Sequence, residues 1–187
     1  MADDPNIALM QSIEEKWGVA ISAACKSSSV PPEFVAALIA NESGGDPTKD
    51  RFEPGVLTSL WQVLMGRSGS FGSIKLADLL LFAAGRSLNS SFLAIDNLAT
   101  SWGLTQIMGY EGIAFGVPIT DLQMPATSLG ITLRMLGQFA SRFQLDMTRD
   151  FDEMFRCWNS GRPHAVTSDP NYSPNGLARM AIYKGLA

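Results

Sequence analysis

The acidic residue Glu42 stands where the pattern of its segment calls for an apolar side chain. Residues 31–45, PPEFVAALIANESGG, have the composition of a short helix. Within it Val35, Leu38 and Ile39 form an apolar stripe at positions i, i+3 and i+4, and position i+7 of this stripe is Glu42. The sequence therefore predicts a carboxylate that points toward the core. A helix-end glutamate that turns to water is the ordinary alternative.

Signals at both ends of the segment define this helix. We expect Ser29 to cap its start, and Pro31 and Pro32 preset the φ angle of a first turn. The pair Gly44-Gly45 can adopt the left-handed conformation that commonly ends a helix. Glu42 would thus lie in the last helical turn.

Two physical effects are expected to raise the pKa of Glu42. Partial burial disfavours the ionised carboxylate, and the last turn of a helix carries the negative end of the macrodipole. A carboxyl group that holds its proton near neutral pH can deliver that proton to a leaving oxygen. The chemistry suggested by this position is general acid catalysis.

The composition excludes several classes of function. A length of 187 residues suits one domain with a genuine core, and a net charge of −4 with 17% charged residues provides no basic face for nucleic acid. The longest apolar runs, 34–40 and 79–84, are far shorter than the roughly 20 residues of a membrane span, so no stable membrane insertion is expected. The first residues, MADDPNIALMQ, have acids where a secretory signal has bases, which predicts no ordinary signal peptide.

The cysteines and the histidine argue for carboxylate chemistry by exclusion. Cys25 and Cys157 are the only cysteines and their separation is typical of buried thiols. His164 is the only histidine, and no cluster of acids or cysteines has ligand spacing, so no metal site and no cofactor are predicted. A serine or cysteine nucleophile would have to use His164, which lies in a loop rich in Pro, Ser and Asp.

The rest of the chain predicts a mainly α fold with little or no sheet. Sustained alternation of apolar and polar residues is missing, and Pro54 favours an extended or turn-like conformation for 51–55. We expect a single domain over 1–187, with 46–100 as an inserted or elaborated segment. Besides the segment of Glu42, helices are expected at 5–24, 56–66, 75–88, 91–99, 103–109, 126–143, 151–158 and 175–183. Asp4-Pro5 has the cap-then-proline pattern of a helix start, and the apolar residues of 126–143 recur at a helical period.

Three further segments have unusual local compositions. They are TSWGLTQIM at 100–108, CWNSG at 157–161, and the pair Asn171-Tyr172 before the last helix. Taken one at a time, each has an ordinary explanation: Gln106 as a surface amide, Asn159 as a helix C-cap and Tyr172 as a loop anchor.

Taken together, and in this order after Glu42-Ser43, the segments resemble the soluble lytic transglycosylase family of the lysozyme-like superfamily, related to goose-type lysozymes. The marks of that family are a helix ending in Glu-Ser, a Gly-Leu-Met-Gln-Ile-Met motif, an Ala-Tyr-Asn-x-Gly motif and a tyrosine before the last helix. They stand here as NESG at 41–44, GLTQIM at 103–108, WNSG at 158–161 and Tyr172.

The resemblance includes departures. Thr105 replaces the usual Met, Cys157-Trp158 replaces Ala-Tyr, and Tyr183 is a rival to Tyr172. A longer segment than in compact members separates Glu42 from the glycine-glutamine motif. It contains RFEPG at 51–55, which looks like the Arg-Tyr-Glu-Pro-Gly segment of a branch of phage and prophage-encoded relatives.

The resemblance implies a single lysozyme-like domain that cleaves the β-1,4 bond between N-acetylmuramic acid and N-acetylglucosamine in peptidoglycan. Glu42 would protonate the glycosidic oxygen and then, as a base, accept the proton of the muramoyl 6-hydroxyl, which gives a 1,6-anhydro product without water. This route needs one carboxylate from the protein. Hydrolysis with inversion needs a second one, at about 6.5–9.5 Å from the first.

The hydrolytic alternative, a muramidase of the lysozyme or endolysin kind, depends on Glu53 as the second catalytic carboxylate. Glu53 could act as a general base or position Glu42, or it could form an ion pair with Arg51 or Lys49 that holds its loop. Asp46 and Asp50 are lesser candidates. The resemblance also implies a substrate-binding set. Its members are Ser43 and Ser101, Gln106 and Met108 on the wall near the acid, Asn159 on the sugar or the end of the Glu42 helix, and Tyr172 reaching toward the Glu42 carboxyl.

The expected partners are the glycan strands of peptidoglycan. The protein would be made in the cytoplasm and act on the bacterial cell wall in the periplasm, as a monomer or as part of a phage particle. A wall-binding or virion structural domain without catalysis is the remaining alternative.

Overall fold

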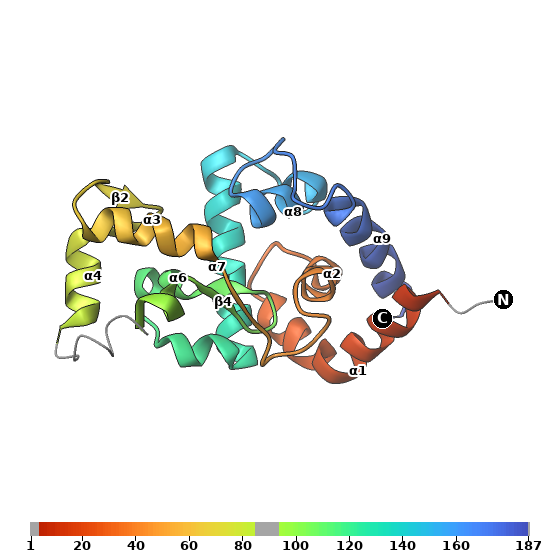
Figure 1. Cartoon of the computed structure of the whole chain (residues 1–187). Coiled ribbons are helices and arrows are strands. Elements are labelled where there is room, and N and C mark those ends of the chain that lie inside the picture. The colour runs from red at the N-terminus through yellow and green to blue at the C-terminus, as the bar shows by residue number, and fades with distance from the viewer. Residues whose placement is uncertain (1–3, 85–93, 187) are drawn as a thin grey trace. The chain divides into compact units, whose positions relative to one another are not determined.

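A computed structural model describes residues 4–84 and 94–186 of the chain. Helices account for 63% of its residues and strands for 7%, which confirms the predicted mainly α fold class (Figure 1). The chain forms two compact units, Met1–Asp46 with Leu129–Ala187, and Pro47–Ser128. The segment predicted as an insertion, 46–100, falls almost wholly in the second unit. The grouping of 1–187 as one domain stays a prediction.

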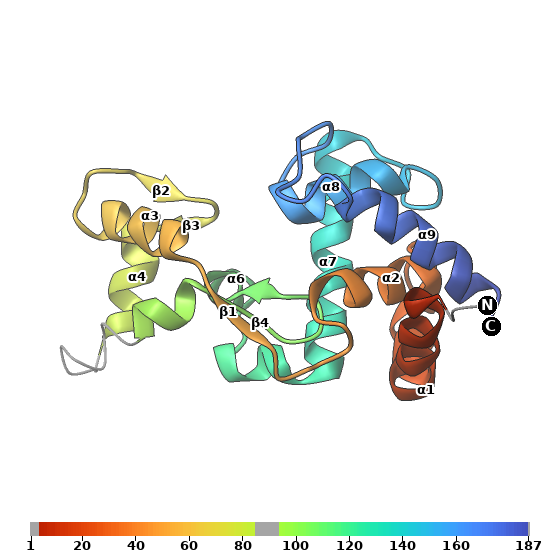
Figure 2. The same ribbon diagram turned by 45° about the vertical axis from the view of Figure 1, so that its right-hand side comes forward.

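The first unit is helical, and its centre is α2. Helix α2 packs against α1 and α9, and α9 also packs against α1 and α8 (Figures 1 and 2). The helices of this unit are α1 (Pro5–Cys25), α2 (Pro32–Glu42), the part of α7 (Pro125–Phe143) from Leu129 onward, α8 (Phe151–Ser160) and α9 (Tyr172–Lys184).

Helix α2 is buried on every side rather than along one stripe. Every residue from Phe34 to Ala40 is at most 7% exposed, so the predicted inward stripe is buried together with the residues between its members. The Phe34 ring stacks on the Phe155 and Phe151 rings of α8, with centroids 4.4 and 5.9 Å apart. Two helices that are distant in sequence are thereby joined near the start of α2. Glu42, the last residue of α2, is half-buried.

The helix ends follow the predicted signals with one correction. The Asp4 carboxylate caps α1 by accepting from the Asn6 backbone N–H at 2.9 Å. Ser29 does not cap α2, because the helix begins at Pro32 and its N-cap position is Pro31. After α2 the predicted left-handed glycines are present, with φ of 66° at Gly44 and 89° at Gly45.

The second unit combines short helices with two small antiparallel sheets. Strand β4 lies between β1 and β5, with Ser101 opposite both Arg51 and Met108, and β2 pairs with β3. The elements are β1 (Asp50–Phe52), α3 (Pro54–Leu64), β2 (Ser70–Phe71), β3 (Ile74–Lys75), α4 (Leu76–Ala83), a helical stretch at 94–98, β4 (Thr100–Trp102), β5 (Ile107–Met108), α6 (Gly109–Phe115) and the 3₁₀ helix η1 (Ile119–Gln123). A small apolar core fills the unit and consists of Leu60, Val63, Ile74, Leu79, Ile95, Leu98 and Ala99.

The segment 103–109 was expected to be helical, but residues 103–106 make the turn between β4 and β5, residues 107–108 are β5, and only Gly109 is helical, as the first residue of α6. Gly103 and Gln106 have φ angles of 76° and 54°, which an α-helix does not accommodate. A Cβ on Gly103 would lie 2.2 Å from the Leu122 carbonyl oxygen, and one on Gly109 would lie 2.1 Å from the Asn97 carbonyl oxygen. These glycines therefore allow two backbone segments to approach the hairpin closely.

Other expectations differ from the structure only in their limits. Helix α9 begins at Tyr172, three residues before the predicted start, and α4 ends at Ala83. Parts of the helices expected at 75–88 and 91–99 fall on residues 85–93, outside the described part of the chain. In the ranges 4–84 and 94–186, none of the helices combines the length and the hydropathy needed to cross a membrane.

Gly103→Ala tests the close approach at the hairpin. We expect it to lower the free energy of unfolding by about 2 kcal/mol or more, because alanine at positive φ is strained and its Cβ meets backbone that cannot yield cheaply. Gly137→Ala in α7 is the control, because its Cβ would meet no neighbouring atom within 4 Å. That substitution should raise stability by roughly 0.5–1 kcal/mol. Equal melting temperatures for the two variants would contradict this account of the motif.

Candidate active site

The carboxylate of Glu42 accepts a hydrogen bond from the hydroxyl group of Tyr172. Glu42 ends α2, Tyr172 begins α9, and 130 positions of sequence separate them. Tyr172 is 8% exposed, so the hydrogen bond is made beside the core of the first unit. The predicted approach of Tyr172 to the acid is present. The rival Tyr183 is buried further along α9, where burial first and Glu14 next raise its pKa.

Three contacts hold Tyr172 in place. The Asn41 side-chain amide donates to the Tyr172 backbone carbonyl at 2.8 Å. The ring meets the Phe155 ring edge to face, with centroids 6.3 Å apart and an interplanar angle of 81°. The hydroxyl of the next residue, Ser173, donates to the Asp152 carboxylate at 2.5 Å. Both the backbone and the ring of Tyr172 are therefore fixed independently of its bond to Glu42.

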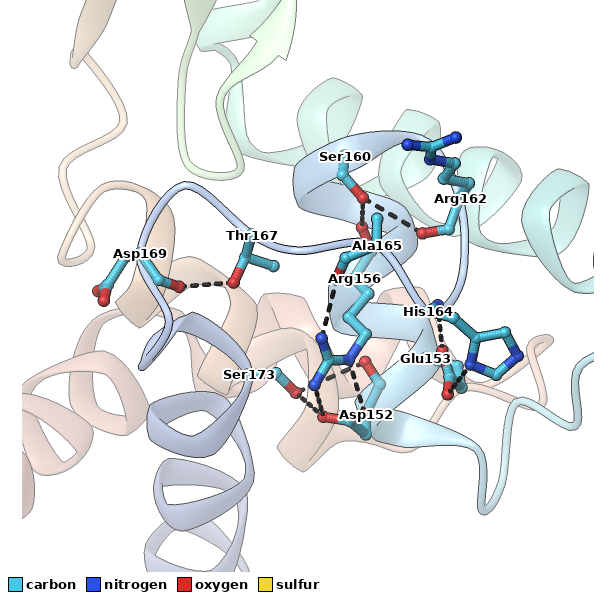
Figure 3. A network of polar contacts seen from close by, with 10 residues as sticks. All are labelled: Asp152, Glu153, Arg156, Ser160, Arg162, His164, Ala165, Thr167, Asp169 and Ser173. Atoms are coloured by element: carbon cyan, nitrogen blue, oxygen red, sulfur yellow. Dashed lines mark hydrogen bonds and ion pairs between the residues drawn. The ribbon is translucent and has the colours of Figure 1, made fainter.

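The loop before Tyr172 is tied to α8 by two adjacent carboxylates (Figure 3). Asp152 accepts from the Arg156 guanidinium at 2.8 Å, and Arg156 also donates to the Ala165 carbonyl at 2.9 Å. The hydrogen bond from Arg156 is the main cause that lowers the pKa of Asp152. Glu153 accepts from the backbone N–H of His164 and pairs with its Nδ1, both at 2.7 Å. His164 lies in a loop, as predicted, and its contacts with Glu153 tie that loop to α8.

Ser43 shapes the turn that follows the acid. Its hydroxyl donates to the Ile39 carbonyl at 3.3 Å and accepts from the Gly45 N–H at 3.1 Å. The Trp17 indole N–H of α1 donates to the Gly45 carbonyl at 3.0 Å. These bonds satisfy backbone groups beyond the end of α2. They give Ser43 a structural part beside its predicted substrate contact, which stays a prediction.

Asn159 lies near the end of α8 and is half-buried. Its side-chain carbonyl accepts from the Ser168 backbone N–H at 3.3 Å, which adds another tie between α8 and the loop toward α9. Within the described hydrogen bonds, Asn41 and Arg179, rather than Asn159, hold the end of the Glu42 helix. A contact of Asn159 with sugar remains a prediction.

In the second unit, the side chain of Gln106 is buried and holds the hairpin turn together by hydrogen bonds. Its amide donates to the Lys49 and Gly103 carbonyls at 2.9 and 3.1 Å and accepts from the Ser101 hydroxyl at 3.0 Å. Gln106 and Ser101 are 8% and 1% exposed, so the interpretation of Gln106 as a surface amide is wrong. Met108 ends β5 and is half-buried.

Glu53, the proposed second carboxylate, belongs to this unit and forms an ion pair. Its Oε1 lies 2.6 Å from Nε of Arg51, and the two side chains are 31% and 67% exposed. Its backbone N–H donates to the Ala99 carbonyl at 2.9 Å, directly before α3 begins. The alternative in which an Arg51 ion pair holds the loop is thus present in the structure. A catalytic role of Glu53 stays a prediction.

Four polar residues were given no role by the sequence analysis. Asn41 and Arg179 support Tyr172 and the end of α2, and Arg179 follows Tyr172 by seven positions, two helical turns on the same face of α9. That spacing was the available signal. Glu111, half-buried in the first turn of α6, has its pKa raised by burial, and Tyr110 beside it has its pKa raised to about 12 by burial and by Glu111.

The thiols and metal ligands give no competing site in the described chain. Cys25 and Cys157 are free and buried, as predicted, and burial raises the pKa of each to about 11. Over residues 4–84 and 94–186, no group of three or more His, Cys, Asp and Glu side chains is placed to hold a metal ion.

A scan against protein-family models, a search of curated proteins and a search of solved structures each found no match to the chain.

Proposed function

We propose that the chain is a peptidoglycan-cleaving enzyme of the lytic transglycosylase kind, with Glu42 as its general acid and then its base. The bond broken is the β-1,4 bond between N-acetylmuramic acid and N-acetylglucosamine. The observation that carries the proposal is the hydrogen bond from the Tyr172 hydroxyl to the Glu42 carboxylate. It joins two of the motifs on which the family resemblance depends.

In the first step Glu42 donates its proton to the glycosidic oxygen, and the bond from that oxygen to the muramoyl anomeric carbon breaks. Since Tyr172 donates to Oε1, the transferable proton of Glu42 belongs on Oε2. The acetamido group of the substrate stabilises the cationic centre. In the second step the ionised Glu42 accepts the proton of the muramoyl 6-hydroxyl, whose oxygen closes on the anomeric carbon. Glu42 then carries a proton again, and no water is consumed.

The surroundings of the two candidate carboxylates favour this route over inverting hydrolysis. Glu42 has a neutral hydroxyl donor, whereas the charge of Glu53 is compensated by Arg51. Transglycosylation uses only Glu42, while inversion needs a second carboxylate that activates water. A muramidase that uses Glu53, and a wall-binding or virion structural domain without turnover, are the outcomes against which the proposal is tested.

The proposed partners are the glycan strands of the bacterial cell wall. The proposed setting is a phage or prophage enzyme made in the cytoplasm that acts on the wall, because 51–55 resembles a segment of phage-encoded relatives. The net charge of −4 gives no attraction to nucleic acid.

Glu42→Gln tests the acid. The amide still accepts from Tyr172 but has no proton to give, so release of fragments from purified peptidoglycan should fall by the ~10²–10⁴ of one acid-base group, while circular dichroism stays unchanged. Glu33→Gln, the same change in the first turn of the same helix, is the control and should keep turnover within about twofold. Near-normal lysis by Glu42→Gln would refute the proposal.

Mass spectrometry of the released muropeptides tests the reaction type. We expect products lighter by one water, with anhydro ends, from the wild type and from Glu53→Ala. Arg51→Ala is the matched variant, because it removes the same ion pair without removing a carboxylate. Reducing ends that disappear in Glu53→Ala and persist in Arg51→Ala would instead show a muramidase with two carboxylates. Binding to the wall without any products would favour a non-catalytic domain.

A further inference from the structure

A series of polar contacts leads from the first turn of α1 to the acid. The Arg179 guanidinium of α9 donates to the side-chain oxygen of Asn6 at 3.0 Å and to that of Asn41 at 2.6 Å. The Asn41 amide donates in turn to the Tyr172 backbone carbonyl, and the Tyr172 hydroxyl donates to Glu42. These contacts thus connect α1 and α9 with Tyr172 and Glu42, the pair on which the proposed chemistry depends.

Arg179 fixes which way the Asn41 amide faces. A guanidinium has donors only, so the atom of Asn41 that it contacts must be the carbonyl oxygen. The amide nitrogen of Asn41 is thereby directed at the Tyr172 carbonyl, which can only accept. With an arginine at one end and a carbonyl at the other, the amide has one stable orientation. An amide between two hydroxyl groups, which can both donate and accept, could rotate by 180° with little cost.

The charge of Arg179 is unfavourable at its position in α9. Arg179 is half-buried, and burial lowers its pKa, which means that its charged form is disfavoured there. The side chains to which it donates are the neutral amides of Asn6 and Asn41, so neither of these partners is an anion that offsets the cost. An apolar side chain at this point of α9 would avoid the penalty. The cost is understandable if the guanidinium is needed to orient Asn41.

We infer that Asn41 and Arg179 are positioning residues that hold the Tyr172 hydroxyl on the carboxylate of Glu42. They act by fixing the backbone of Tyr172 at the first residue of α9, while Ser173 and Phe155 fix the residue from its other sides. The inference rests on the proposed function for its effect on turnover. Its structural part, that the contact between Tyr172 and Glu42 depends on Asn41, can be measured without substrate.

The first measurement is the proton NMR signal of the Tyr172 hydroxyl in the free protein. A hydroxyl that donates to a carboxylate makes a short, strong hydrogen bond and should give a downfield signal, identified by its loss in Tyr172→Phe. Asn41→Leu and Arg179→Met should shift it upfield or broaden it beyond detection. Arg149→Met is the control, because its guanidinium pairs with Asp146 at the surface of the same unit, and it should leave the signal in place. An unchanged signal in both test variants would overturn the inference.

The second measurement is a double-mutant cycle on the release of wall fragments. Asn41→Leu should reduce turnover on the order of tenfold in the wild-type background and less than about twofold in the Tyr172→Phe background, because its effect passes through Tyr172. A residue that merely stabilised the fold would reduce turnover by the same factor in both backgrounds, and that outcome would overturn the inference. Arg179→Lys keeps the charge and one donor, so it should recover part of the turnover that Arg179→Met loses.

The two readouts separate this inference from the proposed function. If the wild type releases no fragments but Asn41→Leu abolishes the hydroxyl signal, the positioning role stands and the proposed function fails. If Asn41→Leu does not fold by circular dichroism, the same cycle with Arg179→Lys decides, with a partial loss in the wild-type background and none in Tyr172→Phe as the supporting result.

Discussion

A carboxyl group at the C-terminal end of a buried helix needs a hydrogen-bond donor that the helix itself cannot provide. The last turn of α2 exposes carbonyl oxygens, and the backbone N–H groups that follow it, those of Ser43 and Gly44, already donate to the Ile39 carbonyl. Tyr172, at the start of the last helix, donates to Glu42. Packing of α9 on α2 is therefore a condition for the site as well as for the core. Two further sets of contacts support the hydrogen bond between Tyr172 and Glu42. They are the phenylalanine stack between α2 and α8 and the hydrogen bond from Ser173 to Asp152 of α8.

The motif residues divide into those that build the backbone and those with chemistry to offer. Gly103 lies against a neighbouring backbone segment, Gln106 closes the hairpin turn with its amide, and Ser101 holds that amide. These contacts account for the residue types without any substrate. Glu42 and Tyr172 are different, because a hydroxyl on a half-buried carboxylate is not needed to close a turn or end a helix. A resemblance in motifs thus mixes residues that the fold itself explains with residues that are candidates for chemistry, and the contacts separate the two groups.

The helices could be predicted where local signals decide them. The Asp4 cap, the glycines after α2 and the apolar period of α7 act over a few residues, and the structure has each of these elements. The hairpin at 100–108 could not be predicted, because its turn is set by close approach to Leu122, a residue distant in sequence. The same holds for the site. Its acid was visible as a break in a local pattern, whereas the support from Asn41 and Arg179 arises only when α9 folds back on α2.

The partner of an acid determines what that acid can do. A guanidinium is a charged donor and forms an ion pair with a carboxylate, as Arg51 does with Glu53. A tyrosine hydroxyl is neutral and can donate to the carboxyl group in either protonation state, so it orients Glu42 without fixing its charge. The proposed reaction requires this property, because one group must give a proton and then take one. Arg179 donates to amide oxygens and not to the acid, so its positive charge is not paired with Glu42. Asn41 lies between them: it accepts from Arg179 and donates to the Tyr172 carbonyl, and in this way it passes the orienting effect of the guanidinium to Tyr172.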